Sequence, residues 1–170
     1  MNIKSLIGDY EAFFSDLCTR LKYVSIDVQG MSISHLCYRV TTQLEYEQLR
    51  DQIKPLCKAF SERQFNGRAI SLLELKEPLT LPDHRYVPLI ELPAPRGEHT
   101  YPKGLEHVGF VVGESLPKFK IKYKAVLTGE KNRPHTDPAF ITFDNGATAK
   151  FYERTLKEIV KLQGGQFQQV

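Results

Sequence analysis

The chain has 170 residues, of which 41% are hydrophobic and 25% are charged. This length and composition fit one globular domain, 1–170, with a core of its own, and they argue against long disordered segments. The formal charge of +3 is weaker than that of a dedicated nucleic-acid binder, so we expect no nucleic-acid partner.

The cysteines and the apolar segments indicate the cellular compartment in which we expect the protein. Three cysteines at wide spacing form no Cys-x-x-Cys pair, which argues against a disulfide framework and a thiolate zinc site. No stretch approaches the roughly eighteen apolar residues of a membrane span. Asp9 and Glu11 interrupt the N-terminal segment where a signal peptide would be continuously apolar. We therefore expect a soluble cytoplasmic protein without a membrane partner.

The first half of the chain predicts a leading helix and then one β-α-β-β-β module. Apolar residues recur at helical spacing through residues 2–22, which predicts an amphipathic helix. The first module covers residues 33–93, and Asn66-Gly67 is typical of a turn inside it. Its expected elements are a strand at 34–40, a helix from Thr41 or Thr42 to Lys54, and strands at 59–64, 69–75 and 86–92.

A connection rich in proline and glycine, residues 93–104, leads to a second module at 104–153. After a strand at 105–112, residues 118–127 also alternate like a strand, so the second module lacks or shortens its helix. Two further strands, joined by the turn Asp144-Asn145-Gly146, and a closing helix at 155–163 complete the prediction. The sum is an α+β domain with two β-rich halves.

Four lysines would lie on one face of the strand predicted at 118–127: Lys118, Lys120, Lys122 and Lys124. Such a stripe could follow the phosphates of a nucleic acid. It is more typical of an edge strand that its charge keeps soluble and unpaired, and we favour this interpretation.

Two strands seventy-two residues apart share one pattern, with a histidine at the second position of each. They are Ser34-His35-Leu36-Cys37-Tyr38-Arg39-Val40 and Glu106-His107-Val108-Gly109-Phe110-Val111-Val112. Successive side chains of a strand point to opposite faces, so each histidine faces away from its apolar neighbours. The pattern indicates a duplicated module that offers one imidazole from each copy.

The last strand of each module adds one polar side chain, Glu91 in the first and Lys150 in the second. Two imidazoles and a carboxylate are a common ligand set for divalent metals, so His35, Glu91 and His107 are the candidate ligands. Lys150 has only donors and would neutralise Glu91 or hold an anionic substrate group. The alternative is a pair of structural histidines, with Glu91 in an ion pair with Lys150.

Two arginines are candidates for binding a substrate. Arg39 shares the strand face of His35 and could bind a carboxylate or phosphate; the alternative is an ion pair with Glu91 or Glu74. Arg68 follows the predicted turn and could face the same concavity.

The chain resembles the YecM-like proteins, a small bacterial family with the vicinal oxygen chelate architecture of glyoxalases, bleomycin-resistance proteins and dioxygenases. The resemblance covers residues 34–151. It depends on His35 with Arg39, Asn66-Gly67-Arg68, Leu75-Lys76-Glu77-Pro78, Ile90-Glu91-Leu92-Pro93 with Pro95, and Tyr101-Pro102 with Gly104 and Glu106-His107.

This resemblance implies two βαβββ modules that form one cupped mixed sheet, with metal ligands on the first and last strands of each module. Carried over, those positions are His35, Glu91, His107 and Lys150. Lys150 stands where the superfamily usually has an acid, which argues against strong metal affinity and against glyoxalase-type proton abstraction.

We therefore expect a protein that binds a divalent metal ion, Zn, Fe, Mn or Ni, and a small-molecule ligand. The expected activity is metal-assisted isomerase, lyase or oxygenase chemistry on a small oxygen-bearing molecule. The alternative is a non-catalytic module that uses the same concavity to hold an anionic small molecule.

Overall fold

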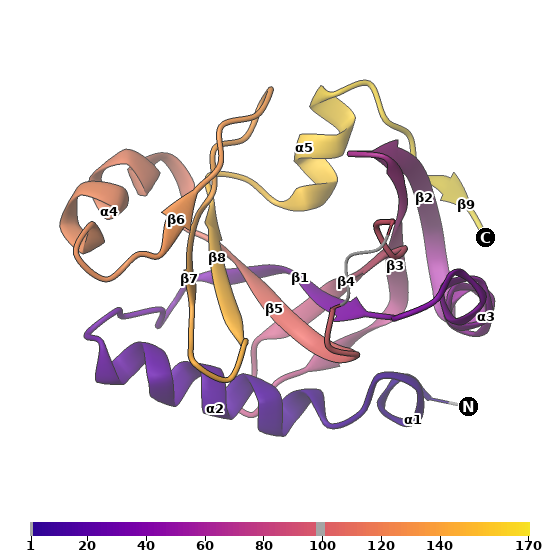
Figure 1. Cartoon of the computed structure of the whole chain (residues 1–170), viewed down its shortest axis with the longest axis horizontal. Helices are drawn as coiled ribbons and strands as arrows, with labels where there is room; N and C mark the ends of the chain where they lie inside the picture. The colour runs from indigo at the N-terminus through magenta and orange to yellow at the C-terminus, as the bar shows by residue number, and fades with distance from the viewer. Residues whose placement is uncertain (1, 98–100) are drawn as a thin grey trace.

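A computed structural model describes residues 2–97 and 101–170 and shows a sheet with helices on both faces (Figure 1). The chain begins with two helices, α1 (Ile3–Ile7) and α2 (Tyr10–Tyr23), where the sequence predicted one. Gly8, at a φ of 84°, ends α1, and the Asp9 side chain then caps α2 by accepting from the Ala12 N–H. The prediction missed this break because apolar spacing continues across it.

The first module follows the predicted order. It consists of β1 (Ser32–Arg39), α3 (Gln43–Ile53), a 3₁₀ turn (Lys54–Leu56), β2 (Cys57–Phe65), β3 (Arg68–Thr80) and β4 (Tyr86–Pro93). Thr42 caps α3 through its side chain. Asn66 and Gly67 both have positive φ, 53° and 75°, which forms the tight turn between β2 and β3.

The second module contains a helix where the sequence predicted a strand. It consists of β5 (Gly104–Val111), a 3₁₀ turn (Gly113–Ser115), α4 (Leu116–Tyr123), β6 (Gly129–Glu130), β7 (Ala139–Thr142) and β8 (Thr148–Tyr152). Helix α5 (Leu156–Leu162), with a capping box at Thr155, and β9 (Gln168–Gln169) follow.

The strand predicted at 118–127 was therefore wrong, and so was the edge strand of lysines. Pro117 stands in the first turn of α4, where proline suits a helix. Leu116 and Phe119, three residues apart, bury one face of the helix, and the Phe119 ring lies 4.5 Å from that of Phe151. A short amphipathic helix with lysine at every second position imitates the alternation of a strand. On a helix, that spacing spreads the lysines around the axis.

The sheet has nine strands among the described residues, in the order β6-β7-β8-β5-β1-β4-β3-β2-β9. β1 pairs with β4 in parallel and β5 with β8 in parallel, while β1 and β5 pair antiparallel at the centre. Each half is thus a βαβββ module, and the two are related by an approximate twofold axis between β1 and β5. The predicted α+β class with paired modules is confirmed, and α4, at 8 residues against 11 in α3, is the shortened helix.

The two faces of the sheet have different coverings. The main core lies on the face covered by α2, and it includes Leu36, Val108 and Phe110. On the opposite face, Leu72 and Leu89 pack with Val160 of α5. Figure 1 shows the two ends of the sheet rising on either side of α5. None of the helices in the described ranges is long and apolar enough to cross a membrane.

Candidate metal centre and its pocket

Three side chains from three neighbouring strands meet at the centre of the α5 face. Nε2 of His35 lies 3.2 Å from Nε2 of His107, and Oε2 of Glu91 lies 3.3 Å from the first and 3.0 Å from the second. Strand register explains the meeting, because Cys37 of β1 is paired with both Glu91 of β4 and His107 of β5. Both imidazoles are buried.

The triangle formed by these three atoms has the size of one face of a metal coordination sphere. Ligands about 2.1 Å from a metal ion lie about 3.0 Å apart in octahedral and about 3.4 Å apart in tetrahedral geometry. The observed edges of 3.0 to 3.3 Å fall in this range. Three lone-pair donors converging in a buried place repel one another unless a cation or protons lie between them. These residues therefore fit a divalent ion.

The other nitrogen of each imidazole has its own partner. Nδ1 of His35 lies 2.9 Å from the Ser34 hydroxyl oxygen, which also accepts from the Leu156 N–H at the start of α5. Nδ1 of His107 lies 3.1 Å from a carboxylate oxygen of Glu106. When each Nδ1 carries the proton and donates to these oxygens, both Nε2 atoms are free to bind a metal.

Burial sets the charge state of the three candidate ligands. It lowers the pKa of His35 to about 4 and that of His107 to about 3, so both imidazoles are neutral at pH 7. Burial alone would raise the pKa of Glu91, but the interactions of its carboxylate with His107 and His35 outweigh burial and hold that pKa well below its usual range. A carboxylate with two neutral imidazoles is the protonation state that metal binding requires.

Gly109 provides the space for the His35 ring. It is the β5 partner of His35, and a Cβ atom built on it would lie 2.6 Å from Nδ1 and 3.0 Å from Nε2 of that ring. Real side chains do not approach this closely, so only glycine leaves the imidazole where it is.

Arg39 lies next to the centre, but its ion-pair partner is neither of the two expected. Its Nε and Nη2 bind both carboxylate oxygens of Glu106, while Glu74 binds Lys157 instead. The remaining nitrogen, Nη1, is buried without a hydrogen-bond partner. Arg39 therefore supports the Glu106 that contacts His107 and keeps one free donor.

Arg68 and Lys150 line the same pocket as Arg39 and Glu91. The Arg68 side chain donates to the Ala94 carbonyl through Nη1, 3.4 Å away, and its Nε is buried without a partner. Lys150 forms no ion pair within 4 Å with any described carboxylate. The ion pair with Glu91, which was the alternative expected from the sequence, is therefore not formed. Burial lowers the pKa of Lys150.

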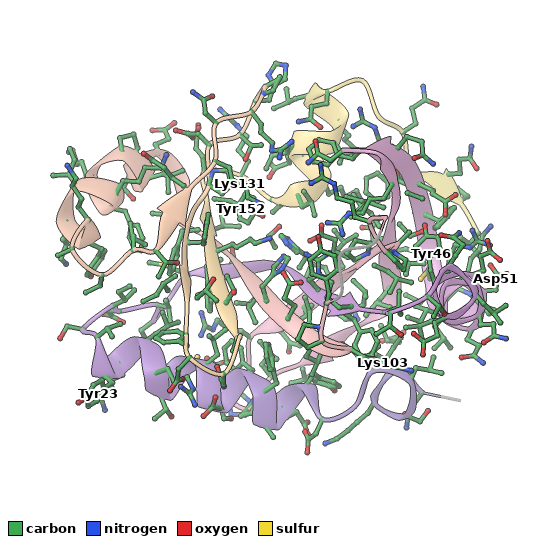
Figure 2. All side chains as sticks on the ribbon, in the orientation of Figure 1. Tyr23, Tyr46, Asp51, Lys103, Lys131 and Tyr152 are labelled. Carbon is green, nitrogen blue, oxygen red and sulfur yellow. The ribbon has the colours of Figure 1, made fainter. Side chains whose placement is uncertain are left out.

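The pocket lies between the sheet and α5 and has a volume of about 160 Å³. Of the three candidate ligands, Glu91 lines this pocket, whereas the two imidazoles are buried and do not line it. In Figure 2, Lys131 and Tyr152, both lining residues, lie close together in the view. The Tyr152 ring also packs edge-on against His35, with the centroids 5.4 Å apart.

A second group of possible ligands shares His107 with the first: Cys37, Glu106 and His107. Burial raises the pKa of the Cys37 thiol to about 12, so the thiol is protonated at neutral pH and is a poor ligand. Glu106 is already bound to Arg39. The first group is therefore the better candidate.

The sequence patterns predicted that His35, Glu91 and His107 would converge, but they did not predict the residues that orient the two imidazoles. Ser34 and Glu106 each precede a histidine, and strand alternation places such neighbours on the opposite face. Both still reach Nδ1 of the following ring. A signal for Gly109 was present, because glycine is rare inside a strand and often marks a close approach.

Comparison with known proteins gives one consistent result. The model of the YecM protein family matches residues 2–163. Protein YecM of Escherichia coli K12 is 25% identical over 177 residues, covering 93% of this chain and 92% of that protein. An uncharacterised protein of Haemophilus influenzae is 29% identical over 71% of this chain and 62% of its own length. A solved structure described as Structural Genomics, Protein EC4020 has a TM-score of 0.71 at 25% identity, covering 95% of this chain and 96% of that one.

Proposed function

The chain belongs to the YecM protein family, and from this premise we propose that it binds one divalent metal ion through His35, Glu91 and His107. The observation that carries the proposal is the convergence of three lone-pair donors at 3.0 to 3.3 Å. Burial lowers the pKa of both imidazoles, which favours the neutral form that binds a metal. Two imidazoles and one carboxylate suit Zn²⁺, Fe²⁺, Mn²⁺ or Ni²⁺ and leave coordination positions open.

The vicinal oxygen chelate superfamily is the proposed wider group. Two features support the assignment: the paired βαβββ modules around an approximate twofold axis, and candidate ligands on the first strands of both modules and the last strand of the first. The corresponding position of the second module is Lys150 on β8.

The proposed activity is metal-assisted isomerase, lyase or oxygenase chemistry on a small oxygen-bearing molecule. A bound divalent ion would polarise an oxygen of that molecule or acidify a water. The chain itself supplies the orientation: Nη1 of Arg39, Nε of Arg68 and the Lys150 ammonium can hold an anionic group and stabilise negative charge that develops on it. Glu106 would fix the tautomer of His107.

A non-catalytic module for an anionic small molecule is the second candidate. The observation that favours it is Lys150, a cation that lies near Glu91 without an ion pair to it. Such a module would bind its ligand equally well after a chelator had removed all metal.

Metal analysis of the purified full-length chain tests the proposal. We expect close to one ion per chain after incubation with Mn²⁺, Fe²⁺, Ni²⁺ or Zn²⁺ and removal of excess metal. Glu91→Gln, which keeps the side-chain shape, and the double variant His35→Ala, His107→Ala should each lose it.

His84→Asn is the matched control, because His84 lies in the turn before β4 and has a positive φ of 66° that asparagine tolerates. It should retain metal like the unmodified chain. Failure of the unmodified chain to bind any of the four ions, or equal occupancy in Glu91→Gln, would contradict the metal centre and favour the binding module.

A further inference from the structure

The pocket above the metal centre is lined by a large excess of positive charge. Six cationic side chains line it, against one carboxylate, that of Glu91. The six are Arg39, Arg63, Arg68, Lys131, Arg133 and Lys150. Positive groups gathered around a small partly enclosed volume repel one another, so this arrangement costs stability unless something negative binds there.

Most of these cations have no acidic partner among the residues that the structure describes. Only Arg39 among the six forms an ion pair with a described carboxylate, that of Glu106. Several cations away from the pocket do have acidic partners: Arg50 binds Asp51, Lys120 binds Asp137, and Lys157 binds Glu74. Five cations without an ion pair to a described carboxylate therefore share one small pocket.

The cations can be divided by their contacts into two groups, which we call inner and outer. The inner group, Arg39, Arg68 and Lys150, includes the two buried nitrogens that lack any hydrogen-bond partner, Nη1 of Arg39 and Nε of Arg68. Buried donors without partners are rare in folded proteins and indicate a missing acceptor. Both arginines also lie against the ring of Tyr101, with guanidinium carbons 4.8 and 5.6 Å from the ring centre.

The outer group, Arg63, Lys131 and Arg133, lies at the rim. Lys131 is exposed, and the two arginines bind only neutral groups: Arg63 donates to the side-chain oxygen of Gln163 and Arg133 to that of Asn66. These contacts orient the guanidinium groups without cancelling their charge.

Apolar side chains also line the pocket. They are Ile70 and Leu72 of β3, Phe140 of β7, and Leu156, Ile159 and Val160 around α5. One water takes roughly 10–15 Å³ of such space, so the volume of about 160 Å³ accommodates a ligand of about ten non-hydrogen atoms.

We propose that this pocket binds a small elongated dianion, with an acidic group at each end of a short apolar segment. The inner cations hold one acidic group against the metal centre, and the rim cations hold the other. The proposal rests on the proposed function for the contact with metal, whereas the preference for two negative ends follows from the cations themselves.

Linear dicarboxylates of increasing length, from succinate to suberate, are the probes. Isothermal titration of the full-length protein at fixed ionic strength compares each with the monocarboxylate of equal length, for example adipate with hexanoate. We expect adipate to bind at least about tenfold more tightly than hexanoate, since it adds one charge-assisted contact. Affinity should pass through an optimum with chain length.

Variants of the rim cations and of the inner cations test which acidic group each set of cations binds. Arg63→Gln and Lys131→Gln should weaken adipate binding towards that of hexanoate and leave hexanoate unchanged. Arg68→Gln should weaken the binding of both adipate and hexanoate. Arg154→Gln, an exposed arginine paired with Glu153, is the control and should change neither. Equal affinity for the two acids, or a rim variant that weakens both equally, would overturn the proposal.

Metal content measured on the same preparations keeps the two proposals apart. Metal binding without a dianion preference would refute this inference and leave the metal centre standing. A dianion preference that persists in chelator-treated protein lacking metal would support this inference and favour the binding module over the metal enzyme.

Discussion

The imidazole of His35 occupies the space into which a side chain at Gly109 would project, so the position of a candidate ligand depends on the absence of a side chain on the neighbouring strand. Gly109→Ala should displace the ring and destabilise the fold by about 1–3 kcal/mol, the usual cost of overpacking. Chemical denaturation measures the stability, and metal occupancy should fall in the same variant.

A double variant provides the control for this steric argument. If the clash is with the imidazole, Gly109→Ala should cost much less stability in a His35→Ala background than in the unmodified chain. Equal costs in both backgrounds would mean that the added methyl group clashes with something other than the ring.

Glu106 should control metal affinity although it is not a candidate ligand of the first group. It contacts Nδ1 of His107 and binds Arg39, so Glu106→Gln removes the charge that fixes this tautomer. We expect the metal dissociation constant, measured by competition with a chelator, to rise roughly 10- to 100-fold. Glu153→Gln, whose carboxylate pairs with Arg154, should have no effect. An unchanged affinity in Glu106→Gln would show that His107 is oriented without this carboxylate.

The metal-free protein should lose stability on mild acidification. Burial lowers the pKa of His35 to about 4 and of His107 to about 3, so between pH 6.5 and 4.5 the unfolded chain binds more protons than the folded one. The free energy of unfolding therefore decreases as the pH is lowered through this window, by up to about 1.4 kcal/mol per pH unit for each histidine. Urea denaturation in the presence of chelator measures this slope. His107→Gln should reduce it to about half, and an unchanged slope in that variant would contradict the assignment.

Lys150 gives a test of the fourth ligand position. Lys150→Glu places a carboxylate near Glu91 and removes a cation, so we expect the affinity for Mn²⁺ or Zn²⁺ to rise at least about tenfold. Lys150→Gln, which only removes the charge, should lie between this variant and the unmodified chain in a chelator competition assay. If Lys150→Glu leaves the affinity unchanged, position 150 does not act on the metal centre.

The sequence was sufficient for the strands of the first module, for β5, β7 and β8, and for the three converging side chains, because these follow local rules. Alternation along β1 and β5 fixed the faces of His35 and His107, and their equivalent positions in two modules predicted that they would meet. Helix α4 was missed because its lysine at every second position imitates a strand, while the tertiary contact that decides the matter, Phe119 on Phe151, is not local.

The sequence patterns did not predict the rim cations either, because the contacts that bring these side chains together are not local in the sequence. Arg63 and Arg133 lie in different modules, and nothing in their local sequence links them. They face one pocket only because the ends of the sheet rise on both sides of α5. That these cations have no acidic partner among the described residues can be recognised only from the folded structure.

The antiparallel pairing of β1 with β5 joins the two halves of the chain. His35 lies on β1 and His107 on β5, so an ion held between them would cross-link segments seventy-two positions apart. Such an ion would add RT ln(1 + [M]/Kd) to the free energy of unfolding, about 2.7 kcal/mol when the free ion is at a hundred times its Kd. The three candidate ligands would then also hold the two halves of the chain together, so the metal-depleted protein in a cell starved of metal would open more readily between its halves.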